Sequence, residues 1–420
     1  MALACLFVKT LMSREEVARY ADAVVKVGLA LGRGDDLLVN CQPAHREFAV
    51  AVVEAGYRAG ARNVDVDYVD PLIRAAYLRA APDAAVGVVT RWRAARLRAM
   101  TKPETASLWI AGEGEPGALD AVPGARVAED VKRSTDRLSD LRRESRLGKR
   151  RWSIAGWPTP AWAKKVYPRL NVDEAQRRLG RDLLDFCRVG PNDPPGITGL
   201  REHLRMLQQR ARRLTRLNLS SLELRGRGTR LSVAFHPDTL WAGGGSTNFY
   251  GKRTAPNLPT EECFTSPVAS ATEGTFRCSQ PLMFQGTLIE GISGEFRGGR
   301  LVRLDAKRPA ERDFLADFLF AIKDADRLGE VALVDSSSRI GKSRRIFFNT
   351  LLDENAAAHI AFGAGFAHTR TNHTETRARR GVNRSDAHVD VMIGTDHFEV
   401  TGTDARGRRV PLIADGAWQI

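Results

Sequence analysis

The sequence has few of the features that place a chain outside the cytoplasm. Its five cysteines are an odd number without a CxxC pair, which argues against a disulfide framework and favours a reducing compartment. No apolar run approaches the roughly 18–20 residues that a membrane span needs. The opening MALACLFVKT has no basic start and is soon followed by the charged SREEVARY, so we expect no secretory signal. We therefore expect a cytoplasmic protein with no membrane partner.

Lysine is also scarce. Of the 64 basic residues, 11 are lysine and 53 are arginine, and the net charge is +14. Such a charge invites a nucleic-acid interpretation. The arginines are spread along the chain, however, with local concentrations at 142–151 and 205–216 and no accompanying nucleic-acid-binding motif. We interpret them as a solvated, arginine-rich surface and expect no specific nucleic-acid partner.

The sequence lacks the GxGxxG fingerprint of dinucleotide-binding proteins. The glycines of 28–36 come before a predicted strand instead of after one, so dinucleotide binding is disfavoured. The first half instead alternates apolar runs with amphipathic stretches, which predicts βαβ units and a largely parallel sheet. The predicted strands are 35–42, 61–70, 106–114 and 151–158, and the predicted helices are 45–60 and 172–190.

After an arginine-rich helical segment at 196–216 the sequence changes to strands and turns. Strand patterns occur at 221–235, 286–306, 330–338 and 388–394. Because single cores stop growing at about 250–300 residues, 420 residues indicate two domains. The fold class is therefore α/β. We predict an N-terminal α/β domain at 1–216 with a largely parallel sheet, and a C-terminal α+β metal-binding catalytic domain at 217–420.

The segment His388-Val389-Asp390 is the strongest chemical signal. Side chains of a strand alternate between its faces, so His388 and Asp390 project from the same side. An imidazole and a carboxylate on one rigid strand suit a divalent cation such as Zn²⁺. The alternative is a buried strand in which the two polar groups hydrogen-bond to each other.

Two further residues are weaker candidates when taken alone. Glu330 opens the predicted strand 330–338, where a carboxylate either reaches a cleft or lies exposed. His359 lies in 349–363, which we predict to be a helix with a capping box at Thr350 and a stop at Gly363. On that helix His359 shares one face with Leu352, Asn355, Ala356 and Ile360, and a histidine on such a face is usually a core residue.

Glu262 lies in 256–267, where three prolines exclude a helix and predict a loop that presents Glu261, Glu262 and Cys263. Taken alone, a solvent-facing turn is the simpler interpretation. Cys263 is rejected as a nucleophile, because the neighbouring Glu262 raises a thiol pKa. Together, two histidines and three carboxylates at the ends and turns of one domain form a set able to hold two metal ions, with Asp390 as the natural bridging ligand.

These residues lie in motifs that resemble the thermophilic-type metallo-aminopeptidases (the aminopeptidase T and aminopeptidase S type). The motifs are PNLPTEECFTSP, GTLIEGISGEFRGGRLV, GEVALVDSSS, FFNTLLDENAAAHIAFG and NRSDAHVDVMIG. The resemblance extends more weakly over the first half, for example in VVEAGYRAGARNVDVDYVD. It thus covers most of the chain.

The resemblance implies that a two-metal site is held by Glu262, Glu330, His359, His388 and Asp390. It also implies a cytoplasmic homodimer and two divalent ions per chain. The identity of the ion does not follow from the resemblance; we expect zinc, with cobalt, magnesium or manganese as alternatives. One departure stands out. The family has a tyrosine seven residues after the histidine that corresponds to His359, and this chain has Phe366 at that position. The missing hydroxyl can lower turnover or change the substrate, unless His368 or His373 replaces it as a donor.

The leading hypothesis is a metal-dependent aminopeptidase that removes N-terminal residues from peptides. A metal-bound hydroxide attacks the first carbonyl, and Glu261 or Glu262 carries the proton. Two alternatives stay open. One is a divergent metal-dependent amidase on a modified small substrate, motivated by Phe366. The other is a non-catalytic basic binding protein on the same scaffold.

Overall fold

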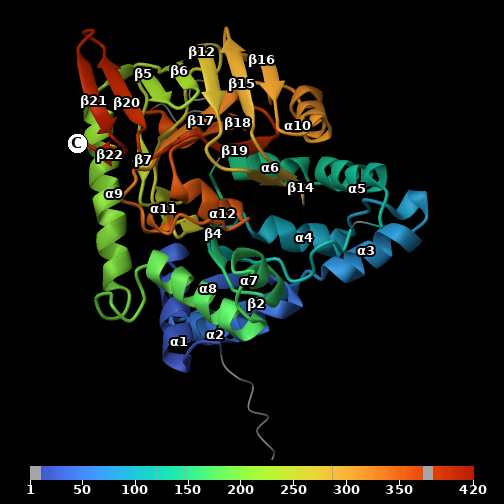
Figure 1. Cartoon of the computed structure of the whole chain (residues 1–420). Helices are drawn as coiled ribbons and strands as arrows, with labels where there is room; N and C mark the ends of the chain where they lie inside the picture. Colours follow the sequence, from blue (N-terminus) through green and yellow to red (C-terminus); the bar gives the residue numbers. More distant parts are fainter. Residues whose placement is uncertain (1–10, 120, 147, 286, 372–381) are drawn as a thin grey trace, which may run out of the picture.

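The structure is a computed structural model that describes residues 11–119, 121–146, 148–285, 287–371 and 382–420. In Figure 1 the N-terminal half forms the lower part of the molecule and most of the C-terminal half forms the upper part. Within the described residues, no helix combines the length and the apolar character needed to cross a membrane.

The first half of the chain is built on a five-stranded parallel sheet, which we call the N-terminal sheet. Its order is β10-β4-β3-β1-β2, and each pairing is parallel. Helices connect its successive strands, because parallel neighbours need a crossover. Its first four strands are Asp36–Cys41 (β1), Asn63–Tyr68 (β2), Thr105–Ala111 (β3) and Arg151–Gly156 (β4).

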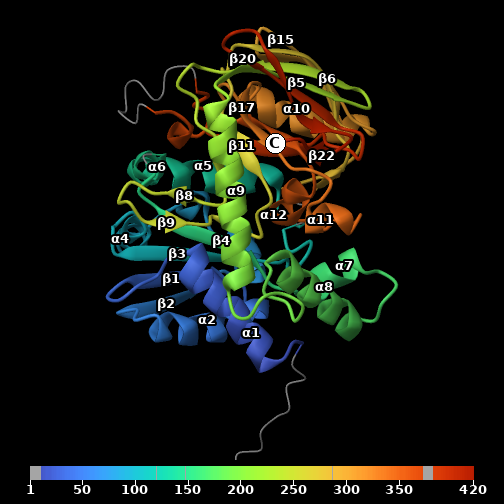
Figure 2. The same ribbon diagram turned by 90° about the vertical axis from the view of Figure 1, so that its left-hand side faces the viewer.

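Several helices of this half pack on the N-terminal sheet, and the last is a long helix that reaches into the second half of the molecule (Figure 2). They are Arg14–Ala23 (α1), Arg46–Arg58 (α2), Pro71–Ala80 (α3), Arg91–Ala99 (α4), Gly124–Arg137 (α5), Ser139–Arg146 (α6), Pro160–Val166 (α7), Val172–Phe186 (α8) and Thr198–Arg216 (α9). Short 3-10 or π turns lie at Val24–Gly28, Pro43–His45 and Asp83–Ala85.

The second half contains two larger antiparallel sheets. The site sheet has the order β19-β18-β17-β11-β7, and the outer sheet has the order β16-β15-β12-β6-β5-β20-β21-β22. The strands of the site sheet are Ala242–Gly243 (β7), Cys263–Thr265 (β11), Leu328–Leu333 (β17), His359–Gly363 (β18) and His388–Met392 (β19). Those of the outer sheet are Leu219–Gly226 (β5), Thr229–Ala234 (β6), Thr272–Arg277 (β12), Ser293–Arg297 (β15), Arg300–Asp305 (β16), Glu399–Asp404 (β20), Arg409–Ala414 (β21) and Ala417–Trp418 (β22).

The remaining elements are short or lie at the edges of these sheets. They are Ser246–Thr247 (β8), Arg253–Thr254 (β9), Asn257–Leu258 (β10), Leu282–Phe284 (β13), Thr287–Ile289 (β14), Pro309–Ala321 (α10), Arg339–Lys342 (α11), Thr350–Asp353 (α12) and 3-10 turns at Glu354–Ala356 and Ala367–Thr369.

One face of the site sheet packs on the outer sheet. Val331, Ile360 and Val391 are aligned across β17, β18 and β19 and belong to the main core of this half. Phe362 on the same face contacts the rings of Phe276 and Phe296, at centroid distances of 5.8 and 5.7 Å. Because strand side chains alternate, the residues between these apolar positions point to the opposite face. That opposite face carries the candidate site.

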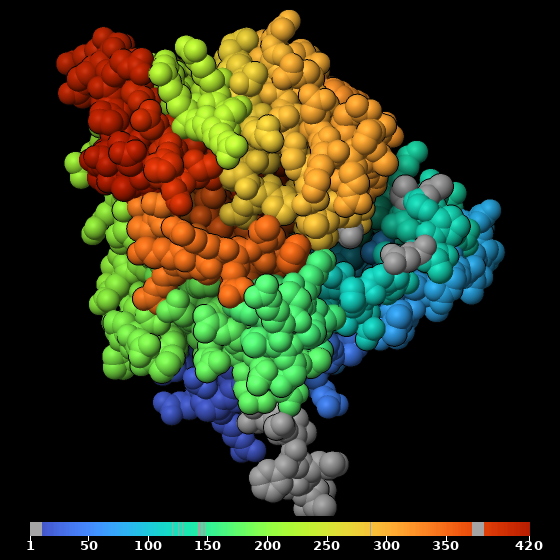
Figure 3. Space-filling model, viewed as in Figure 1, coloured from blue at the N-terminus to red at the C-terminus, as the bar shows by residue number. Residues whose placement is uncertain are grey.

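The two halves of the chain are joined in several places. Strand β10 pairs with β4, so the segment just before Glu262 extends the N-terminal sheet. Trp162 of α7 donates its indole N–H to the Phe347 carbonyl oxygen at 2.6 Å. In Figure 3 the orange segment that contains α11 and α12 lies between the green α8 region and the upper half.

The predicted fold class is confirmed: a parallel α/β half is followed by an antiparallel half with few helices. The predicted helices 45–60, 172–190 and 196–216 correspond to α2, α8 and α9. The helix predicted at 349–363 is wrong, for a reason given below. Since β10 belongs to the second half of the sequence but to the N-terminal sheet, the division at residue 216 stays a prediction.

Candidate metal centre

The face of the site sheet opposite the outer sheet gathers the predicted site residues from four positions in the chain. Glu262 immediately precedes β11, Glu330 lies in β17, and His359 begins β18. His388 and Asp390 lie two residues apart on β19. The register aligns Ala332 with His359 and Ala361 with Asp390, so these side chains share one face.

The side chains of these residues are in direct contact. His359 Nε2 lies 3.2 Å from Glu262 Oε2, and His388 Nε2 lies 3.2 Å from Glu330 Oε2 and 3.3 Å from Asp390 Oδ1. Their possible ligand atoms form two groups, each within 4.8 Å: Glu262, Glu330 and His359, and Glu330, His388 and Asp390. Glu330 is common to both groups, whereas Asp390, which we expected to bridge, belongs to one.

In both histidines a hydrogen bond from Nδ1 fixes the orientation of the imidazole ring. His359 Nδ1 lies 3.2 Å from the Ala357 carbonyl oxygen, and His388 Nδ1 lies 3.0 Å from that of Ala364. A carbonyl oxygen only accepts, so each Nδ1 donates and each Nε2 is directed at the carboxylates. Histidines that bind metal ions are typically oriented in this way. The donor set therefore fits a divalent cation.

The cluster carries an excess of buried negative charge. Glu262, Glu330 and Asp390 are each less than one-tenth exposed. Burial, together with the neighbouring Glu262 and Asp390, raises the pKa of Glu330 to about 7, although His388 opposes the shift. Burial lowers the pKa of His359, but Glu262, Asp390 and Glu330 overcome it and raise that pKa to about 10. A cation at this site relieves the repulsion among the carboxylates.

Glu354 is a fourth buried carboxylate that the sequence did not point to. Burial, followed by repulsion from Asp390 and Glu262, raises its pKa well above the usual value. Its Oε1 accepts hydrogen bonds from the side-chain amides of Asn257 at 2.8 Å and Asn355 at 3.4 Å. These contacts orient the carboxylate beside the five other side chains of the cluster. The one available signal was its position, five residues before His359.

The helical prediction for His359 is wrong, since this residue begins strand β18. Helix α12 is capped by the Asn349 side chain instead of by Thr350, and it ends at Asp353. The Asp353 carboxylate accepts from the backbone N–H groups of Phe347 and Asn349, at 2.7 and 2.9 Å, and so holds the segment that leads into the helix. The following HIAFG then pairs on both sides within the site sheet, and Gly363 ends a strand instead of a helix.

Glu330 is not the first residue of its strand, as predicted, but lies in its interior. β17 starts two residues earlier, and its pairing with β18 shifts register between Leu328 and Glu330. The shift falls at Gly329, where an added Cβ would lie 2.2 Å from the Gly363 carbonyl oxygen. A glycine at an irregularity of this kind re-aims the next side chain. Glu330 is thereby placed among the other carboxylates.

The loop that carries Glu262 is buried instead of facing solvent. Glu261 and Glu262 are 6% and 7% exposed. Cys263 next to them is fully buried, and its thiol donates to the Leu207 carbonyl oxygen at 3.5 Å. Burial and Glu262 raise the pKa of this thiol to about 12. The rejection of Cys263 as a nucleophile is consistent with this environment.

Phe366 lies at the edge of the cluster. Its ring centroid is 5.4 Å from that of His388 and 5.2 Å from that of Phe264. A tyrosine here would bring a hydroxyl close to the carboxylates and histidines, so the departure noted in the sequence concerns the site directly. His368 contacts the Phe366 ring at 5.6 Å. His373, the other suggested donor, lies outside the described residues.

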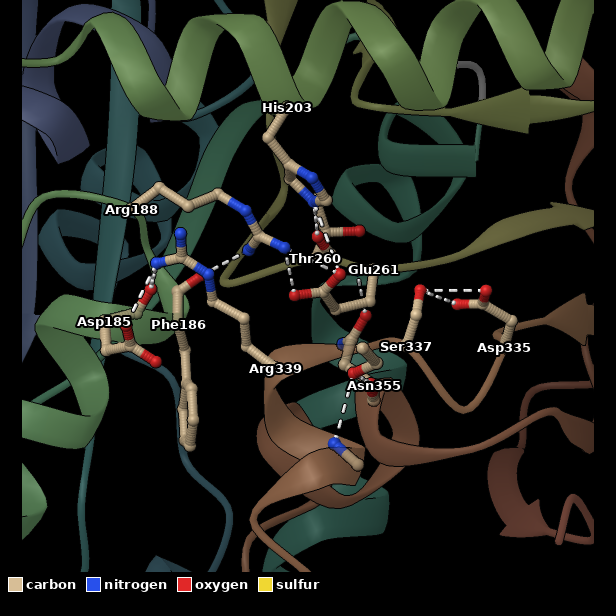
Figure 4. Close-up of polar contacts among 12 residues, drawn as sticks. Asp185, Phe186, Arg188, His203, Thr260, Glu261, Asp335, Ser337, Arg339 and Asn355 are labelled. Atoms are coloured by element: carbon tan, nitrogen blue, oxygen red, sulfur yellow. Dashed lines mark hydrogen bonds and ion pairs between the residues drawn. The ribbon is translucent and has the colours of Figure 1, made fainter. Parts of the chain in front are cut away.

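Glu261 is directed at Arg188 in a polar network of its own (Figure 4). Its carboxylate pairs with Arg188 at 2.7 Å, and its backbone N–H donates to Asn355 Oδ1 at 2.7 Å. On α9, His203 Nε2 donates to the carbonyl oxygen of the preceding Thr260, at 2.8 Å. The network therefore fixes the backbone on which Glu262 stands. No feature of the sequence pointed to Arg188 or His203.

The chain is similar to known metallopeptidases over nearly its whole length. Residues 13–418 match the family model described as thermophilic metalloprotease (M29). The chain is 34% identical to aminopeptidase T of Thermus aquaticus, with 97% of this chain and 99% of the relative covered. It is 30% identical to aminopeptidase AmpS of Bacillus subtilis, with coverages of 96% and 98%. The solved structure of wild-type AmpT from Thermus thermophilus superposes with a TM-score of 0.87 at 32% identity, with 97% of this chain and 100% of that chain covered.

Proposed function

The chain belongs to the thermophilic metalloprotease family M29 and is a metallo-aminopeptidase, and we propose that its catalytic centre is the cluster on the site sheet. In this proposal five side chains hold two divalent metal ions: Glu262, Glu330, His359, His388 and Asp390. The observation that carries it is the arrangement of their donor atoms in two groups that share Glu330. Zinc is the favoured ion, because the donors are imidazole and carboxylate groups.

Two ions held in this way supply a nucleophilic water at neutral pH and polarise the carbonyl of the scissile bond. The protein groups provide the geometry for this chemistry. Ala357 and Ala364 fix the two imidazoles through their carbonyl oxygens, and the Gly329 irregularity aims Glu330 between the two groups. The free α-amino group of the substrate, which is cationic, is attracted by the excess of carboxylates.

Proton transfer needs a carboxylate near the attacking water. Of the two candidates from the sequence, Glu261 is held by Arg188, which leaves Glu262. Glu354 lies beside it, buried and close to the charges of Asp390 and Glu262. Its Oε1 is occupied by two amide donors, so Oε2 is the atom available for a proton or a metal bond. We assign Glu354 to the centre on these grounds.

A second candidate function rests on Phe366. Without the hydroxyl the chain would act on a modified amino acid or a small amide, as a divergent metal-dependent amidase. We also propose a cytoplasmic location, from the odd number of scattered cysteines, and a homodimer, from the family resemblance. A non-catalytic binding protein is set aside by membership of an enzyme family.

Hydrolysis of aminoacyl-anilides by the purified protein tests the proposal. We expect cleavage that a chelator abolishes and that zinc, cobalt or manganese restores. The matched control is the same anilide with an acetylated α-amino group, which should not be cleaved. A metal-loaded protein without activity on a broad panel of anilides and peptides would contradict the proposal, and cleavage of anilides without cleavage of any peptide would favour the amidase.

A further inference from the structure

A second cavity lies one strand away from the candidate metal centre. It has a volume of about 260 Å³ and lies between α9, β7 and the β8–β9 hairpin. Among the residues that line it are Gln208, Arg212, Trp241, Ala242, Arg253 and His368. These come from four separate parts of the chain, so the cavity exists only in the folded protein.

The cavity lies at the β7 edge of the site sheet and reaches the face of the metal centre at Ala242. Glu262 and Phe264 are two residues apart on an extended segment and share a face. Ala242 of β7 is paired directly with Phe264, and opposed residues of antiparallel strands point to the same side. The lining residue Ala242 therefore continues the surface that carries Glu262.

Aromatic rings connect the two places. The Phe366 ring is 5.4 Å from the ring of His388 in the metal centre and 5.6 Å from that of His368 in the cavity. The extended backbone of a tripeptide spans about 10 Å. A peptide whose first residue lies at the metal centre can thus place its third residue at the cavity.

The cavity has a positive charge that nothing in the described chain balances. Arg212 and Arg253 both line it, and neither forms an ion pair with a carboxylate among the residues that the structure describes. Arg253 Nη2 donates to the carbonyl oxygens of Gly244 and Gly245, at 3.0 and 3.2 Å, which holds this guanidinium at the cavity wall. Burial and the charge of Arg212 lower the pKa of Arg253. Two like charges in one cavity favour an anion between them.

We propose that Arg212 and Arg253 bind a carboxylate of the peptide substrate downstream of the scissile bond. The inference rests on the proposed aminopeptidase activity and adds a substrate class to it, namely short peptides with a free C-terminal carboxylate or an acidic side chain at the third position. The arginines contact the far end of the substrate and leave the reaction at the metal centre unchanged.

The test compares kcat/KM for four substrates that share one N-terminal residue, Xaa. They are the free tripeptide Xaa-Gly-Gly, its C-terminal amide, the C-terminal amide of Xaa-Gly-Asp, and the anilide of Xaa. Wild-type enzyme should prefer the free tripeptide over its amide by about fivefold, the size of a partly exposed ion pair. Arg212→Met should bring this ratio close to one, and Arg212→Lys should restore part of it. The anilide, which lacks a carboxylate, should be cleaved equally by all forms.

The matched control is Arg213→Met, which removes the charge of the next residue on α9, outside the cavity lining, and should keep the preference. Cleavage of the Gly-Asp amide at the rate of the free tripeptide would identify any downstream carboxylate as the ligand; slow cleavage would restrict the site to the C-terminus. An equal rate for acid and amide in the wild type, or a ratio that Arg212→Met leaves intact, would overturn the proposal. Failure of the aminopeptidase proposal itself would be separate, because then the anilide is not cleaved either.

Discussion

Arg188 and Glu261 form a buried ion pair immediately beside Glu262. Arg188 Nη2 lies 2.7 Å from one carboxylate oxygen of Glu261 and 2.9 Å from the other, and the two side chains are 11% and 5% exposed. Arg188 follows α8 of the first half, whereas Glu261 belongs to the loop that carries Glu262. The pair therefore ties the metal centre to the N-terminal half of the chain (Figure 4).

We predict that Arg188→Met strongly destabilises the fold. Removal of one partner leaves the other charge buried without compensation, which costs about 3–5 kcal/mol in the free energy of unfolding. Urea unfolding measures this change. Arg225→Met is the matched control, since Arg225 is 51% exposed in its pair with Glu223 and its loss should cost at most about 1 kcal/mol. Equal losses for the two variants would refute the role given to the buried pair.

Phe366→Tyr should increase turnover. A hydroxyl at this ring lies next to His388, where it can donate to the developing oxyanion, and a single donor of this kind contributes about 10²–10³ in rate in other enzymes. We expect kcat for an aminoacyl-anilide to rise by at least about tenfold. Phe264→Tyr adds the same hydroxyl to the neighbouring ring and should give no comparable gain. An unchanged kcat would favour the amidase over a weakened peptidase.

Cys263→Ala should retain activity. The thiol is fully buried, its pKa is raised to about 12, and no thiolate forms at neutral pH. The anilide-hydrolysis rate of this variant should stay within a few-fold of wild type, and iodoacetamide should not inactivate the native wild-type enzyme. Rapid inactivation by iodoacetamide that the Cys263→Ala variant escapes would contradict this prediction.

His45 should make the N-terminal half sensitive to acid. Its Nδ1 accepts the Gln42 N–H at 3.1 Å and its Nε2 donates to the Gly112 carbonyl oxygen at 2.8 Å, so the neutral ring is the one that fits. Burial lowers its pKa from 6.5 to about 4. The unfolded chain therefore binds a proton at this histidine near pH 6.5, whereas the folded chain binds it only near pH 4. The free energy of unfolding therefore falls as the pH decreases across this window.

The expected size of this effect is about 2 kcal/mol between pH 7.5 and pH 5. Urea unfolding at the two pH values measures it, with His45→Gln as the comparison, because glutamine cannot titrate. The variant should lose about 2 kcal/mol less than wild type over this interval. Equal losses in both proteins would show that His45 does not contribute to the acid sensitivity.

The sequence predicts which polar residues lie together on one strand better than it predicts the secondary structure around them. The pairing of His388 with Asp390 followed from strand alternation alone, and the structure shows the two side chains in contact. His359 was assigned to a helix because Leu352, Asn355, Ala356 and Ile360 recur at helical spacing. Helix α12 nevertheless has a single turn, because the residues from His359 on pair with β17 and β19 in the site sheet, which is a tertiary effect that periodicity does not contain.

Other parts of the centre depend on contacts between distant segments. Glu354 joins the cluster only because the helix stops early, and the shared position of Glu330 depends on the irregularity at Gly329. Arg188 lies 73 residues before its partner Glu261, and His203 lies 57 residues before its partner Thr260. No local pattern marks such pairs. The motif resemblance nevertheless pointed to the five proposed ligands. Family motifs mark residues that the fold brings together, even where the sequence does not reveal the contacts between them.

The central claim is that two metal ions share Glu330. The most direct test is the metal content per chain, measured by mass spectrometry after loading with zinc and removal of free ions, for wild type and for Glu330→Gln. We predict two zinc ions per wild-type chain and one or none in the variant, because loss of the shared carboxylate weakens both groups. A wild-type chain that retains no zinc, or a variant that still retains two, would contradict the proposed centre.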